Sequence, residues 1–221
     1  MSDKKHIGGE SMKKIAAFTA VLMLLSGGLC AHAEDSIFDL MVEGGMKVEV
    51  NLADYYMDEM YEAALSGDVE AGRTAEEKRN TVIDMNSYAC EKISFDDLYL
   101  LAKIIYADAG SDWLTDEFRM CVGEVVMNRV ASPEFPNTIY DVIYQKGQYT
   151  AVNASSFTAM IPSQECVDIA LKLIKGERTM APSVVYQSNY IQGELFSVYN
   201  DWHLGTTYFC VSPNQDLYPT E

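Results

Sequence analysis

Apolar residues recur at helical spacing through the segment that follows residue 94. They form a single stripe, at Leu98, Leu101, Ile104 and Ile105. Ser94 precedes this stripe as an N-cap, and acidic residues in the first turn suit the positive end of the helix dipole. Gly110 fits the left-handed position just past a helix C-terminus. The pattern therefore predicts a buried helix that carries Asp108 in its last turn.

A wider apolar face predicts a second, central helix after Thr115, which is its N-cap. The face consists of Phe118, Cys121, Val122, Val125, Val126 and Val130. This helix ends in the segment 128–130, before Pro133 and Pro136. So wide an apolar face implies that the rest of the domain covers the helix on most sides.

The remaining pattern predicts smaller elements. A short helix over 137–144 is followed by an exposed loop over 148–150, and a longer helix covers 163–175. Alternating residues over 184–190 and 207–211 predict two strands that line the far wall of a cleft. The expected fold class is α+β, mainly helical, with a small C-terminal sheet.

The N-terminal segment has the layout of a secretory signal peptide. Two lysines precede an apolar run over 15–25, and Ala31 and Ala33 stand at the small-residue positions before a cleavage site. We expect a start at Met12 and cleavage after Ala33. A lipid anchor at Cys30 or an uncleaved membrane anchor fits less well, because the residue before the cysteine is bulky and the run is short for a span. We therefore predict a secreted, extracytoplasmic protein with no stable membrane span after signal cleavage.

The sequence pattern divides the chain into three predicted parts. Residues 1–33 are the signal region, and 34–92 predict an acidic helical arm with amphipathic segments over 54–65 and 74–85. No internal repeat of a wall-anchoring kind is visible. We expect the arm to pack on or tether the domain over 93–221, and we expect the protein to act as a monomer.

The charge of the predicted secreted form limits its partners. Removal of residues 1–33 leaves 31 of 33 acidic residues but only 12 of 16 basic ones. Such an acidic surface disfavours nucleic acid and anionic membranes. An uncharged polar ligand would instead be bound by aromatic stacking and hydrogen bonds.

The sequence offers no basis for a metal or nucleotide cofactor. It has no CxxC, no pair of histidines at ligand spacing, and no GxSxG, GxxxxGK[ST] or GxGxxG motif. Four cysteines would remain after cleavage, at 90, 121, 166 and 210, and their spacing defines no disulfide framework. We predict no metal site and no cofactor. Export permits disulfides without requiring them, so the sequence assigns no pairing.

Asp108 is the residue whose predicted position suggests chemistry. Unpaired carbonyls at a helix C-terminus carry partial negative charge, and apolar neighbours remove water, so both effects raise the pKa of a carboxyl group there. A carboxyl group that keeps its proton near neutral pH can act as a general acid. The alternative to a catalytic role is that Asp108 is an exposed acid at the helix end or a cap for the following turn.

Three blocks in the order and spacing LAKIIYADAGSD, VGEVVMNRV and SPEFPNTIYDVIYQKGQY resemble the SleB-like cell-wall hydrolase family, the family of spore-cortex-lytic enzymes. The resemblance covers about the last sixty per cent of the chain. It implies a lysozyme-like catalytic domain over 93–221 that cleaves peptidoglycan between N-acetylmuramic acid and N-acetylglucosamine. Characterised members of the family are lytic transglycosylases. The family's pattern has Glu where this chain has Asp108, whose side chain is one methylene shorter.

The resemblance also bears on how many carboxylates are needed. An ordinary glycosidase uses two, whereas a lytic transglycosylase uses one, because the C6 hydroxyl of muramic acid attacks the anomeric carbon. Candidate second acids are Asp112, Asp116, Glu117 and Glu124. Of these, Glu124 stands out, because an acid among valines either faces solvent or is buried in the cleft.

Candidate substrate-binding residues lie near the matched blocks. They are Tyr106, Asn128, Gln148, Tyr149 and His203, with Tyr140 and Tyr144 as further stacking candidates. For Asn128 and Arg129, a structural role in fixing the next loop has equal weight. For His203, a structural role is the simpler interpretation.

The leading hypothesis is a secreted lytic transglycosylase or muramidase with Asp108 as acid and base. One alternative is a catalytically impaired relative that binds glycan strands. Another is an amidase in which a cysteine (121, 166 or 210) acts with His203; apolar helix faces around Cys121 and Cys166 argue for core roles instead.

Overall fold

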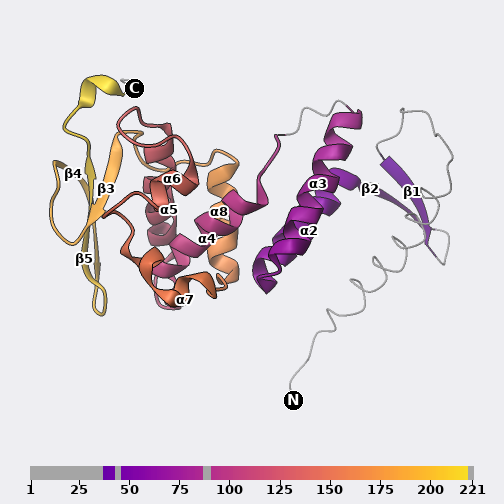
Figure 1. Cartoon of the computed structure of the whole chain (residues 1–221), viewed down its shortest axis with the longest axis horizontal. Coiled ribbons are helices and arrows are strands. Elements are labelled where there is room, and N and C mark those ends of the chain that lie inside the picture. Colours follow the sequence, from indigo (N-terminus) through magenta and orange to yellow (C-terminus); the bar gives the residue numbers. More distant parts are fainter. Residues whose placement is uncertain (1–36, 43–45, 87–90, 219–221) are drawn as a thin grey trace, which may run out of the picture.

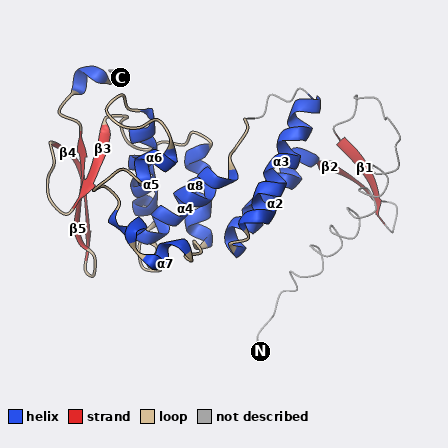
Figure 2. Cartoon of the chain, in the orientation of Figure 1, coloured by secondary structure: helices blue, strands red, loops and turns tan. Residues whose placement is uncertain are grey.

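The computed structural model describes residues 37–42, 46–86 and 91–218, so the predicted signal segment lies outside the described residues. Helices form the middle of the molecule, and a small sheet covers one side (Figures 1 and 2). Within the described ranges, no helix is both long and apolar enough to cross a membrane. The helices are α2 (Leu52–Ser66), α3 (Val69–Asn86), α4 (Phe95–Ala109), α5 (Asp116–Ala131), α6 (Ile139–Ile143), α7 (Ser155–Thr158) and α8 (Gln164–Ile174), with 3-10 turns η1 (Thr150–Asn153) and η2 (Gln215–Leu217).

Helices α4 and α5 begin where their capping residues predict. The hydroxyl of Ser94 accepts a hydrogen bond from the backbone of Asp97, and Thr115 caps α5 through Phe118 in the same way, both at 3.3 Å. The predicted apolar stripe of α4 is fully buried. The predicted conformation of Gly110 is wrong, because its φ is −77°. Glycine is needed there for space: a Cβ would lie 2.3 Å from the carbonyl oxygen of Tyr106.

The C-terminal sheet has three antiparallel strands in the order β3-β5-β4, namely β3 (Val184–Ser188), β4 (Glu194–Asp201) and β5 (Gly205–Val211). The sequence predicted β3 and β5 but missed β4. This edge strand lies largely exposed and carries consecutive apolar residues, so its period-2 signal is weak. The β4–β5 hairpin extends beyond β3, because its register continues to Asp201 opposite Gly205.

Two apolar clusters hold these elements together. The larger one joins α2, α3, α4, α5, α6 and α8, with Phe95, Leu101 and Leu173 among its fully buried members. The smaller one joins the end of α4, α5 and the sheet through Ala109, Phe118 and Phe209. The end of α4 therefore lies where the helical core meets the sheet.

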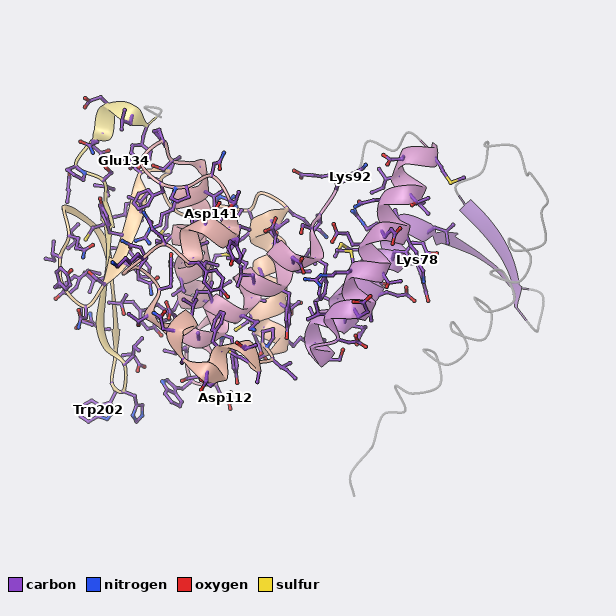
Figure 3. The ribbon with its side chains drawn as sticks, viewed as in Figure 1. Lys78, Lys92, Asp112, Glu134, Asp141 and Trp202 are labelled. Carbon is purple, nitrogen blue, oxygen red and sulfur yellow. The ribbon has the colours of Figure 1, made fainter. Side chains whose placement is uncertain are left out.

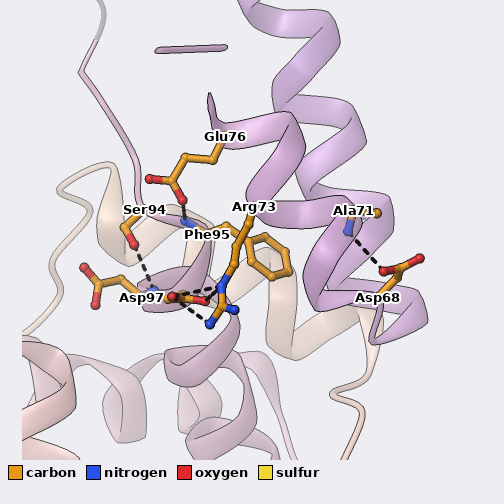
Figure 4. Close-up of polar contacts among 8 residues, drawn as sticks. Asp68, Ala71, Arg73, Glu76, Ser94, Phe95 and Asp97 are labelled. Atoms are coloured by element: carbon orange, nitrogen blue, oxygen red, sulfur yellow. Dashed lines mark hydrogen bonds and ion pairs between the residues drawn. The ribbon is translucent and has the colours of Figure 1, made fainter. Parts of the chain in front are cut away.

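The segment before α4 contains a helical hairpin that packs on the rest of the chain (Figure 4). The carboxylate of Glu76 accepts a hydrogen bond of 2.8 Å from the backbone N–H of Phe95. The Tyr61 hydroxyl donates to Asp168 on α8 at 2.6 Å. A Cβ at Gly72 would lie 2.2 Å from the Phe95 ring, so α3 approaches α4 too closely for any larger residue.

The amphipathic helices predicted over 54–65 and 74–85 are confirmed as parts of α2 and α3. The expectation of helices alone is wrong. Two antiparallel strands, β1 (Ile37–Val42) and β2 (Met46–Asn51), precede α2. The sequence pattern indicated a joint between helices at the glycine pair 44–45, and so it did not predict the two strands.

Candidate functional site

A pocket of about 470 Å³ opens at the C-terminal end of α4. Its size falls in the range of ordinary small-ligand sites. Its lining combines the last turn of α4, the α4–α5 loop and the β4–β5 turn: Tyr106, Ala107, Asp108, Gly110, Ser111, Trp113, Leu114, His203 and Leu204. Two predicted site residues, Tyr106 and His203, thus lie beside Asp108. Among these lining residues of the described chain, Asp108 is the only carboxylate.

Asp108 has the protonation behaviour that its position predicts. Burial raises the pKa of its carboxyl group to about 6. Within the part of the chain that the structure describes, no hydrogen-bond donor contacts its oxygens, and desolvation is the cause of the raised pKa. A carboxyl group with this pKa, facing a pocket, can both give and take a proton near neutral pH.

The opposite wall of the pocket is the tight turn between β4 and β5. The carboxylate of Asp201 accepts hydrogen bonds from the backbone N–H groups of His203 and Leu204, at 2.9 and 2.8 Å. These bonds, with a contribution from Trp113, lower the pKa of Asp201. The ring of Trp113 lies 5.1 Å from the ring of His203, measured between centroids. The α4–α5 loop and the hairpin therefore meet across the pocket.

Arg119 on α5 fixes the turn that follows Asp108. Its guanidinium donates to the carbonyl oxygens of Ala109 at 3.2 Å and Ser111 at 3.0 Å, and to the Asp116 carboxylate at 2.8 Å. The side chain is 5% exposed. The sequence patterns did not single out Arg119, although a basic residue on an apolar helix face could have predicted a buried, hydrogen-bonded side chain.

Gln148 and Tyr149 lie outside this pocket and line a smaller hollow of about 150 Å³. Arg129 joins them to α5. Its guanidinium donates to the side-chain oxygen of Gln148 at 3.0 Å and to the carbonyl oxygen of Val185 at 2.7 Å. It also lies 5.0 Å from the Phe135 ring centre and 5.3 Å from that of Tyr149, so it is sandwiched between two aromatic rings.

Tyr149 corrects the prediction of a wholly exposed loop. Its hydroxyl is buried and has no hydrogen-bond partner among the described residues. Burial raises the pKa of this hydroxyl to about 12, and the charge of Asp108 contributes in the same direction. The hydroxyl therefore lies near enough to Asp108 for the two groups to interact electrostatically.

Asn128 has a structural position. It is 4% exposed, and its amide nitrogen donates to the carbonyl oxygens of Ala181 and Val184, at 3.0 and 3.1 Å. These bonds hold the start of β3 against α5. Of the two roles considered for this residue, fixing a loop is the one that its contacts support.

Glu124 is buried and fully hydrogen bonded. Its carboxylate accepts from the Thr179 backbone N–H at 2.9 Å, the Thr179 hydroxyl at 2.7 Å and the Met180 N–H at 2.7 Å. None of its surface is exposed and it does not line the pocket. The carboxylate therefore anchors the loop after α8 and is not placed as a second catalytic acid.

The cysteines do not form a nucleophile with His203. The three within the described residues are free thiols, and none lines the pocket. Burial raises the pKa of Cys121 to about 11 and that of Cys166 above its ordinary value. Cys90 lies outside the described residues. No cluster of metal-ligating side chains occurs in the described ranges.

Residues 115–209 match the family model described as Cell Wall Hydrolase. The chain is also similar to the spore cortex-lytic enzyme of Bacillus subtilis (strain 168), with 32% identity over 83 residues, which is 38% of this chain and 26% of that relative. The chain thus spans about a quarter of the length of the curated relative it matches. No solved structure matches the chain.

Residues 115–209 are therefore similar to a cell wall hydrolase domain, which confirms the resemblance predicted from the sequence. The matched segment contains α5, Arg129 and the β4–β5 turn with His203. It begins after Asp108 and Trp113, so the family match does not itself assign either residue a role.

Proposed function

We propose that the protein is a secreted peptidoglycan hydrolase that cleaves the glycan strand between N-acetylmuramic acid and N-acetylglucosamine, with Asp108 as its acid and base. The observation that carries the proposal is a lone carboxylate in a pocket whose burial raises its pKa to about 6. The cell wall hydrolase domain supports the substrate class and an extracytoplasmic place of action. A lysozyme-like arrangement of the helices is part of the same proposal.

The chemistry needs a single carboxyl group. The protonated Asp108 donates its proton to the glycosidic oxygen as the bond to the anomeric carbon breaks. The resulting carboxylate then takes the proton of the muramic acid C6 hydroxyl, whose oxygen bonds to the anomeric carbon. The products are a 1,6-anhydromuramic end and a free N-acetylglucosamine hydroxyl, without consumption of water. The absence of a second carboxylate from the described pocket lining supports this route over a two-carboxylate hydrolysis.

A second candidate is a glycan-binding relative with weak or no catalysis. The shorter side chain of Asp108 favours it, because a misplacement of about 1 Å costs on the order of a hundredfold in rate. The amidase alternative has no such support, since no described cysteine shares the pocket with His203.

The test is the clearing of a purified peptidoglycan suspension by the protein and by its Asp108→Asn variant. We expect the wild type to clear the suspension and the variant, which cannot donate or accept the proton, to leave it turbid. Equal clearing by both would refute the role of Asp108. A wild type that sediments with the polymer but leaves it turbid would favour the binding-only candidate.

A further inference from the structure

The two tryptophans of the chain lie in the two loops that line the edge of the pocket. Trp113 is in the loop between α4 and α5, and Trp202 is at the tip of the β4–β5 hairpin (Figure 3). They are 58% and 93% exposed. Large aromatic side chains left in water next to a pocket are typical of ligand contact surfaces.

The protein holds this edge in a defined geometry. The Trp113 ring lies against His203 at 5.1 Å, with an angle of 54° between the ring planes. Asp201 fixes the backbone of the turn, and buried Leu114 fixes the loop from below. Ordering these side chains before a ligand arrives reduces the entropy that binding must overcome.

The chemical character of the edge selects an uncharged polar ligand with an apolar face. The carboxylates of Asp112 and Asp201 accept hydrogen bonds and repel anions such as nucleic acids or acidic lipids. The chain as a whole has a formal charge of −17, which strengthens that repulsion. A pyranose ring matches both features, because its C–H face stacks on an indole while its hydroxyls donate to carboxylates.

We propose that Trp113, together with Trp202, forms a sugar-stacking subsite that binds an N-acetylated pyranose of the glycan strand beside Asp108. The subsite continues from the pocket that Asp108 lines, since Trp113 and His203 belong to the same lining. Trp113 contacts the sugar nearest the bond to be cleaved, and Trp202 contacts the strand further out along the hairpin. This assignment rests on the proposed function for the identity of the strand.

Intrinsic fluorescence reports on this subsite alone, because the two tryptophans are the only ones in the chain. The probe is the β-1,4-linked tetramer of N-acetylglucosamine, titrated into the Asp108→Asn protein so that no cleavage interferes. We expect a saturable change in emission. Trp113→Ala weakens binding about tenfold, whereas Trp113→Phe retains most of the affinity because the aromatic face remains.

Trp202→Ala gives a smaller loss, and Tyr190→Ala, at an exposed aromatic position outside the pocket lining, gives none. Unchanged urea midpoints establish that the variants fold. If an alanine variant does not fold, the phenylalanine variant at the same position is measured in its place. Emission that does not respond to the tetramer, or equal affinity in Trp113→Ala, would overturn the subsite. Self-association through this edge without a response to sugar would overturn it as well, by making the edge a protein contact.

The outcome is separable from that of the proposed function. Saturable tetramer binding without peptidoglycan clearing leaves the subsite standing and removes the enzymatic proposal. If clearing depends on Asp108 but is unchanged in both tryptophan variants, the enzymatic proposal stands and the subsite is removed.

Discussion

The guanidinium of Arg119 lies 3.2 Å from the carbonyl oxygen of Ala109, the residue directly after Asp108. A cation thus occupies the C-terminal end of α4, where the unpaired carbonyls carry partial negative charge. Its contact with Ser111 closes the same turn. The position of the Asp108 carboxyl group therefore depends on a residue of the next helix.

Arg119→Met should destabilise the protein by about 2–4 kcal/mol, because the buried carbonyl group of Ala109 and the partly buried one of Ser111 lose their donor. Urea unfolding measures this loss. Arg73→Met is the matched control: its ion pair with Asp96 is exposed to solvent, so the expected loss is much smaller than that of Arg119→Met. Similar losses in the two variants would contradict the role given to Arg119.

Glu124→Gln should cost about 3–5 kcal/mol of stability, since the amide cannot accept from all the donors that face the buried carboxylate. Activity of the fraction that remains folded, measured at low temperature, should persist. Glu117→Gln, at an exposed position on the same helix, should change stability far less than Glu124→Gln does. Full stability with lost activity in Glu124→Gln would instead place this acid in the chemistry.

The raised pKa of Asp108 predicts a pH dependence of stability. Its folded-state pKa of about 6 lies above the ordinary value of 3.8, so the folded state binds the proton more tightly. Stability is then lost as pH rises from about 4 to 6, and at pH 8 the ionised side chain costs about 3 kcal/mol. Asp108→Asn removes this cost, so the variant should be more stable than the wild type at pH 8 and match it near pH 4. Chemical unfolding at the two pH values measures the difference; a constant difference would show that the carboxyl group is not desolvated.

Arg129→Lys should loosen the segment around Gln148, because an ammonium cannot stack between two rings while also bonding to Gln148 and Val185. Hydrogen exchange of the amides over 146–153 should become faster, with little change in α4. Arg178→Lys, at an exposed position after α8, is the control and should leave this segment unchanged. Unaltered exchange in Arg129→Lys would mean that the loop is held by other contacts.

Local patterns predicted the parts of the site that lie close together in sequence. Ser94 and Thr115 gave the helix starts, and the apolar stripe of α4 placed Asp108 in its last turn. Each of these relations spans only a few residues, so capping and periodicity suffice to predict it. The short turns around 150–158 have no such signal, and η1 and α7 were expected as loop.

Capping and periodicity could not predict contacts between residues that lie far apart in the sequence. The donors that surround Glu124 come from residues 55 and 56 positions later in the chain, so the sequence could pose its two alternatives but not decide between them. Strand β4 was missed because its exposed apolar residues suggest no buried face. With β4 missing, the hairpin that brings Trp202 and His203 to the α4–α5 loop could not be foreseen.

The chemical identity of the soluble products tests the central claim most directly. The protein and its Asp108→Asn and Asp108→Glu variants are incubated with purified peptidoglycan, and the released fragments are identified by mass spectrometry. The account predicts 1,6-anhydromuropeptides from the wild type and none from Asp108→Asn. Fragments from Asp108→Glu alone would contradict it and define the natural protein as a glycan binder, and free stem peptides would contradict it by showing an amidase.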